Sequence, residues 1–317
     1  MKMFRLLLIV AFATGPPRIC NSAVEESQAL EEVHRTAAMM VQRRTTHFRD
    51  QLLPTLTESE AAVVKHIVFD DPSSSPIEGW EIPSAYISKK DKTRHVRLSA
   101  GFGSIMLELS AAATLQQWNP SFVFSDYVRY LGESIGENRE LIRKKRPLKR
   151  AQSSLSFFKV SPEQWDSIME QQWFKDHLLG FMYGIQDFVL AHEIAHHVLD
   201  HLSREPKDLE QSREWERAAD EWAIEAIVRI GELPLGGFVF CMLMLSSRGN
   251  DIVFEHLETH PADFRRMDYM LEAIVNNVRK RADKALPPGT DIDAFESQMS
   301  DVRKQFKAEF EKSVHEE

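Results

Sequence analysis

The chain has 317 residues, of which 43% are hydrophobic, and its formal net charge at pH 7 is −9. This length allows one large domain or two modest ones, and the apolar content is sufficient for a buried core. The acidic balance argues against nucleic acid as a partner, because nucleic-acid binding requires a basic face.

The N-terminus has the outline of a secretory signal peptide. Lys2 and Arg5 precede an apolar run over 6–13, and a Gly-Pro-Pro stretch and small residues follow it. A basic start, a short apolar segment and small residues are the three parts of such a signal. We therefore predict a signal peptide over 1–23 and a periplasmic or secreted protein. The alternative is a cytoplasmic protein with a buried N-terminal segment.

The rest of the chain contains no sequence that could span a membrane. Its most apolar run, 235–245, is far shorter than the roughly 20 residues that a spanning helix needs. Cys20 and Cys241 are the two cysteines, so no disulfide framework exists. We expect a soluble mature chain without a transmembrane span; the sequence does not determine its oligomeric state.

The first third of the chain is predicted to combine two helices with short strands. Apolar residues recur every three or four positions before Pro54, which indicates an amphipathic helix. Short apolar or alternating segments between turn residues indicate strands. The expected elements are a helix over 25–53, strands over 61–69, 80–87 and 95–101, and a helix over 104–118.

The segment 119–165 contains a short aromatic stretch over 122–130 and then a basic run over 139–150. A basic run can bind phosphates or a membrane surface, but such runs are most often solvated loops. We predict a solvated loop here. Ser161 before Pro162 predicts the start of the next helix, with serine as its cap.

The remaining chain is predicted to be helical. The expected helices cover 183–201, 208–230, an apolar segment ending at 245, 262–285 and an exposed segment over 291–312. The sequence thus indicates a predominantly helical α+β domain over 24–285, with a small sheet from 61–100 beside the helix over 183–201. A helical extension over 286–317 follows it.

The helix over 183–201 carries an HExxH motif, in which His192 and His196 are four residues apart. At about 100° per residue the two side chains project about 40° apart, so both can bind one metal ion. Glu193 is rotated about 100° from His192, where its carboxylate can reach a metal-bound water without being a ligand. The motif predicts two zinc ligands and a general base.

A third protein ligand is needed if water is to occupy the fourth position of tetrahedral zinc. Glu216 begins an ExxAD pattern, and Asp220 shares its helix face by the same four-residue spacing. We predict that Glu216 is the third ligand and that Asp220 accepts a hydrogen bond from a ligand histidine. The alternative is that both are ordinary acids of a charged helix, because other acidic residues surround them.

Two further histidines follow the motif. His197 and His201 are rotated about 100° and about 140° from His196, so neither can join the pair on one metal. We predict that each lies behind a ligand or at the surface. The metzincins, another class of zinc peptidase, need glycine at 199 and histidine at 202. Both positions are leucine here, so the sequence excludes a metzincin.

The HExxH and ExxAD pair resembles the gluzincin metallopeptidases. The later segment Thr259-His260-Pro261, followed by Arg265 and Arg266, resembles the HtpX-like and CAAX-protease-like branch, and the three segments together look most like the phage-exclusion Lit-type peptidases. The resemblance implies a zincin-like metallopeptidase domain with one zinc ion. The chain differs from the membrane-bound branch because no membrane helix is expected, and a leader peptide would be unusual for a cytosolic Lit-type protein.

Hydrolysis through a tetrahedral intermediate needs a donor for the developing oxyanion. His260 lies in a His-Pro turn, and the resemblance supports a role at the site, so we predict it as a second catalytic residue. Tyr183, Arg265 and Tyr269 are the alternative donors.

These residues together predict a zinc-dependent endopeptidase whose substrate is a protein or peptide. One alternative is a non-catalytic, zinc-stabilised helical adaptor, in which four protein ligands would close the metal site. Another is a metal-dependent hydrolase that acts on a different class of substrate, which these residues leave open.

Overall fold

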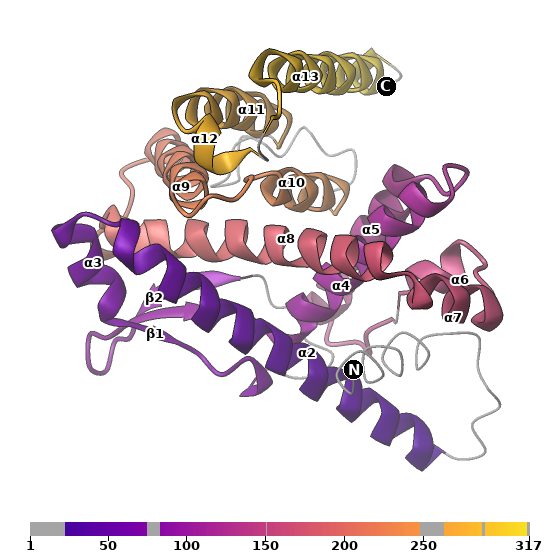
Figure 1. Ribbon diagram of the computed structural model, residues 1–317. Helices are drawn as coiled ribbons and strands as arrows, with labels where there is room; N and C mark the ends of the chain where they lie inside the picture. The colour runs from indigo at the N-terminus through magenta and orange to yellow at the C-terminus, as the bar shows by residue number, and fades with distance from the viewer. Residues whose placement is uncertain (1–22, 75–82, 150, 248–262, 287–288, 316–317) are drawn as a thin grey trace.

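The long helix α8 (Gln172–Val198) runs through the centre of the molecule, and α2, α4, α9 and α10 are among the elements that pack on it (Figure 1). The computed structural model describes residues 23–74, 83–149, 151–247, 263–286 and 289–315. Most of these residues are helical, and they include one three-stranded sheet, which confirms the predicted α+β, predominantly helical class.

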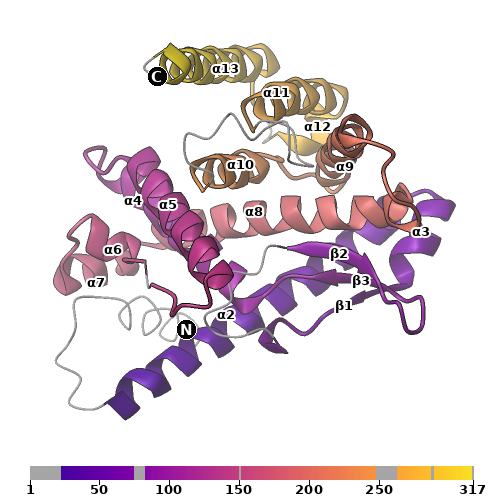
Figure 2. The same ribbon diagram turned by 180° about the vertical axis from the view of Figure 1, so that it is seen from behind.

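Helix α2 (Ala23–Leu52) and the sheet lie on the same side of α8 (Figure 2). In the sheet β3 (Arg94–Arg97) is central, with β1 (Ile67–Phe69) parallel to it and β2 (Ser84–Ile87) antiparallel to it. Strand β2 is therefore an outer strand, and it contacts α8. The predicted sheet beside the central helix is confirmed.

Helices α9 (Leu209–Arg229) and α10 (Gly236–Ser246) cover the opposite side of α8, and α11 (Asp263–Lys280) lies beyond them (Figure 1). The other described elements are α3 (Glu58–Lys65), α4 (Ala100–Trp118), α5 (Phe124–Arg143), α6 (Ser154–Phe157), α7 (Pro162–Glu170), α12 (Ala282–Ala285), α13 (Ile292–His315) and the 3-10 turns η1 (Leu53–Thr55), η2 (Pro72–Ser74) and η3 (His201–Ser203).

The middle of α8 is buried on all sides. Every residue from 185 to 195 is buried, so the polar side chains in this stretch need partners inside the protein. Gln186 donates from Nε2 to the backbone oxygen of Val41 at 2.8 Å, and the carboxylate of Asp187 pairs with Arg44 of α2. These contacts hold α2 against the central helix.

The backbones of α10 and α8 come into close contact at Gly236 and Gly184. A Cβ atom at Gly236 would lie 2.1 Å from the carbonyl carbon and oxygen of Gly184, so only glycine fits there. Gly236 begins α10, and this contact therefore sets where the following residues of α10 lie along α8.

We expect Gly236→Ala to lower the free energy of unfolding by about 1–3 kcal/mol, because the added methyl group must push the two helices apart. Denaturant unfolding followed by circular dichroism measures the change. Gly180→Ala is the matched control: it lies in α8 with nothing within 4 Å of the added Cβ. The control should raise the free energy of unfolding by about 0.5–1 kcal/mol, as alanine does in a helix interior. Equal effects of the two substitutions would contradict the assigned helix contact.

The predicted strand over 61–69 is wrong over most of its length. Residues 58–65 form α3, and only Ile67–Phe69 pair in the sheet. A capping box explains the helix, because Thr57 Oγ1 accepts from the N–H of Glu60 and Glu60 Oε2 accepts from the N–H of Thr57. Glu60 also accepts from Trp222 Nε1 at 2.9 Å, which ties α3 to α9.

An aromatic stretch was expected over 122–130 and a solvated loop over 139–150, but Phe124–Arg143 forms one helix, α5. Buried Tyr127, Leu131 and Ile135 repeat at helical spacing and pack into the core. Residues 144–149 of the basic run form a loop, and residues 144–147 there are exposed.

Three predicted helix boundaries shift and the others hold within a few residues. Helix α4 begins at Ala100 because Ser99 Oγ accepts from the N–H of Phe102 at 3.0 Å. Helix α8 begins at Gln172, eleven residues before the predicted start, and ends at Val198. The capping box of Ser161 and Gln164 confirms the predicted start of α7.

Residues 1–22 lie outside the described residues, so the signal peptide over 1–23 stays a prediction, as does the division at 285. Among the helices that the structure describes, none combines the length and apolar character needed to cross a membrane.

Candidate metal centre

Three ligand atoms meet where α8 packs against α9. His192 and His196 present their Nε2 atoms, which are 3.2 Å apart, and Glu216 places carboxylate oxygens 3.3 Å from the first and 3.5 Å from the second. One ligand atom from each residue lies within 4.8 Å of the others. The structure thus brings together all three predicted ligands in an arrangement that can hold one metal ion.

The hydrogen bond behind His192 suits metal binding. Its Nδ1 lies 2.8 Å from Asp220 Oδ1, and Asp220 is completely buried. An ionised carboxylate can only accept a hydrogen bond, so His192 Nδ1 carries a proton and donates the hydrogen bond to Asp220. The proton on Nδ1 leaves the Nε2 lone pair of the neutral ring for a metal, which is how ligand histidines are usually oriented. The predicted role of Asp220 agrees with this contact.

Asp220 is itself held by α11. Arg266 donates from Nε and Nη2 to the two carboxylate oxygens, both at 2.7 Å, and Tyr269 donates its hydroxyl to Oδ2 at 2.7 Å. Burial raises the pKa of Asp220, but the charges of Arg266 and His192 outweigh burial and lower it to about 2. Asp220 is therefore ionised at neutral pH.

The surroundings shift the pKa values of the two histidines in opposite directions. Burial lowers the pKa of His192, but Asp220 and Glu216 outweigh burial and raise it to about 10. Burial and the neighbouring His192 lower the pKa of His196 to about 3. Metal binding requires both rings to be unprotonated at Nε2, so it displaces any proton held there.

A cleft of about 250 Å³ opens beside the ligands. Its walls come from the outer strand β2, from α8 and from α10. Glu193 lines the cleft beside both ligand histidines, as the HExxH geometry predicted, and 9% of its surface is exposed. The lining residues are Pro83, Ser84, Ala85, Phe188, Val189, His192, Glu193, His196, Leu202, Glu216, Phe240, Met244 and Arg266.

The other predicted residues of the site fall into two groups. Tyr269 donates to Asp220, and Tyr183 lies under the guanidinium of Arg44 with 4.7 Å between the guanidinium carbon and the ring centre. Neither residue lines the cleft, so neither is placed as an oxyanion donor. His260 and the side chain of Arg265 lie outside the described residues, and the role of His260 stays a prediction.

The two additional histidines do not reach the metal position. His197 donates from Nε2 to the backbone oxygen of His95 in β3 at 2.8 Å. His201 lies behind His196, with the two Nδ1 atoms 3.1 Å apart.

Sequence reasoning missed Arg266 as the partner of Asp220, although a buried carboxylate on α9 required a cation from some other element.

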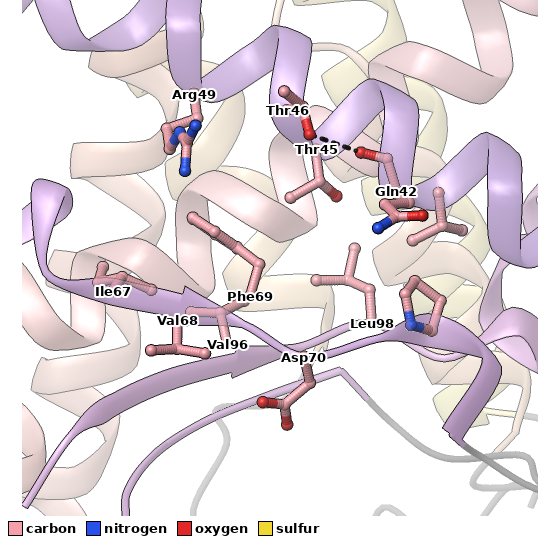
Figure 3. Close-up of a pocket in the computed structure, with 12 residues that line it drawn as sticks. Gln42, Thr45, Thr46, Arg49, Ile67, Val68, Phe69, Asp70, Val96 and Leu98 are labelled. Carbon is pink, nitrogen blue, oxygen red and sulfur yellow. Dashed lines mark hydrogen bonds between the residues drawn. The ribbon is translucent and has the colours of Figure 1, made fainter.

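A second cavity, of about 290 Å³, lies between α2 and the sheet (Figure 3). It shares no lining residue with the cleft, and Asp70 is the single carboxylate among its lining residues. His95, Tyr86 and Arg97 bind that carboxylate at 2.8, 2.8 and 3.1 Å. The cavity therefore lacks the set of ligands found beside Glu193.

Comparison with known proteins relates this chain to a peptidase family. The family described as Peptidase U49 matches residues 162–284, a segment that contains the three candidate ligands, Glu193 and the pair of Asp220 and Arg266. No curated protein and no solved structure gave a significant match. The family match supports peptidase activity, with a protein as the substrate.

Proposed function

We propose that this chain is a zinc-dependent endopeptidase, in which His192, His196 and Glu216 hold the metal ion and Glu193 is the general base. The observation that carries the proposal is the convergence of three buried ligand atoms beside a cleft. Two imidazole nitrogens and one carboxylate are a ligand set found in catalytic zinc sites, which keep the fourth position for water.

A zinc ion at this position would polarise a water molecule and lower its pKa. Glu193 accepts a proton from the attacking water and then gives it to the leaving amine, as a general base and acid. Asp220 keeps the Nδ1 proton of His192 in place throughout, and thereby keeps Nε2 directed at the ligand position. We propose His260 as the donor to the oxyanion.

The position of β2 supports a peptide as the substrate. Ser84 and Ala85 of this outer strand line the cleft. An extended peptide can add to the edge of a sheet through main-chain hydrogen bonds, which do not depend on its sequence. The apolar walls from Phe188, Phe240 and Met244 would then receive its side chains.

A metal-removal experiment tests the proposal. We expect the purified protein to contain about one zinc ion per chain, and a chelator to remove both the ion and the hydrolysis of a proteome-derived peptide library. Added zinc should restore hydrolysis, with cleavage products identified by mass spectrometry. Unchanged cleavage by metal-free protein would contradict the proposal, and bound zinc without any cleavage product would favour the zinc-stabilised adaptor.

A further inference from the structure

His201 occupies the same place behind His196 that Asp220 occupies behind His192. The Nδ1 atoms of His196 and His201 are 3.1 Å apart, within hydrogen-bond distance, and the two ring planes are 70° apart. His201 is 6% exposed. Two nitrogens at this distance share one proton, since one must donate and the other accept.

The proposed ligand role of His196 decides which nitrogen donates. A neutral imidazole has one N–H, and a metal on Nε2 requires that this N–H is at Nδ1. His196 Nδ1 must then donate to His201 Nδ1, and His201 must carry its own proton on Nε2. The opposite arrangement would place the proton of His196 on Nε2 and block the ligand position.

The surrounding chain holds His201 in this orientation. Asp200 has φ of 57°, in the left-handed region, and turns the chain back so that His201 faces the end of α8. Arg94 supports the turn by donating from Nη1 to the backbone oxygen of His197 at 2.7 Å. The ring of His201 stacks on Trp215, with 5.1 Å between ring centres and 5° between planes.

We infer that His201 is a positioning residue for the metal centre, which selects the Nδ1–H form of His196 and directs its Nε2 at the ion. This inference rests on the proposed function. The two ligand histidines then donate to different kinds of acceptor. His192 donates to the charged carboxylate of Asp220, whereas His196 donates to the neutral ring of His201. A neutral acceptor polarises its histidine less strongly than a carboxylate does.

Two substitutions separate the acceptor from the stacked ring. His201→Phe keeps an aromatic ring for Trp215 but removes the acceptor, and we expect the zinc Kd to rise by about 10- to 100-fold. His201→Gln keeps an acceptor and loses the aromatic ring, and its Kd should stay within about threefold of the wild type because the hydrogen bond is retained. Competition with a chromophoric chelator measures Kd, and thermal unfolding of the metal-free proteins checks that each variant is folded.

The reverse order of the two variants would overturn the inference and assign His201 a packing role only. Nuclear magnetic resonance of the zinc-loaded wild type with ¹⁵N-labelled histidine gives an independent answer if a variant does not fold. A proton on His201 Nε2 supports the inference, whereas a proton on His201 Nδ1 overturns it. Failure of the wild type to bind zinc would overturn both proposals, whereas tight zinc binding by His201→Phe would overturn only the role of His201.

Discussion

Glu193→Gln is expected to reduce kcat by at least about 10²- to 10⁴-fold, which is the range for loss of a general base. Glutamine has nearly the shape of glutamate but cannot accept a proton from the attacking water. Glu193 is not one of the three converging ligands, so the variant should still bind about one zinc ion per chain. Zinc content and turnover of a peptide found by the library experiment give the two measurements.

The matched control for this prediction is Glu221→Gln in α9. This glutamate is half exposed and pairs with Arg217 one helical turn away, so its substitution removes one carboxylate outside the cleft. Its kcat should equal that of the wild type. If Glu193→Gln retained wild-type kcat with zinc bound, another group would have to take the proton from water, and the mechanism proposed above would be wrong.

Arg266→Met is expected to lower the free energy of unfolding by about 3–5 kcal/mol, the usual cost of leaving one member of a buried ion pair without the other. Asp220 is completely buried and would lose two hydrogen bonds of 2.7 Å. The support behind His192 would weaken as well, so zinc affinity should fall by about 10- to 100-fold. Denaturant unfolding of the metal-free protein and chelator competition measure the two effects separately.

Arg279→Met provides the control on the same helix. Arg279 also pairs with a carboxylate, Glu296 of α13, but 63% of its side chain is exposed. Exposed pairs contribute about 0–1 kcal/mol, so stability and zinc affinity should change little. Similar losses in both variants would show that α11 acts only as a packing element and that the contact of Arg266 with Asp220 has no special role.

Local sequence was sufficient for the part of the site that lies within single helices. The helical repeat places His192 and His196 on one face, and the same repeat relates Glu216 to Asp220. These relations do not depend on the rest of the fold, so spacing alone could predict them. Local patterns missed the helices α3 and α5, because the capping box at Thr57 and the apolar stripe of α5 compete with strand-like and charged patterns in the same segments.

Only the tertiary structure decided what surrounds the ligands. Arg266 reaches Asp220 across 46 positions of the chain, and no local pattern distinguishes it from the neighbouring arginine at 265. The two histidines after the motif look alike in the sequence, yet the turn at Asp200 brings His201 behind His196, while His197 contacts β3. Periodicity determines which residues share a helix face, but the partner of that face depends on how distant elements pack, which is a property of the whole fold.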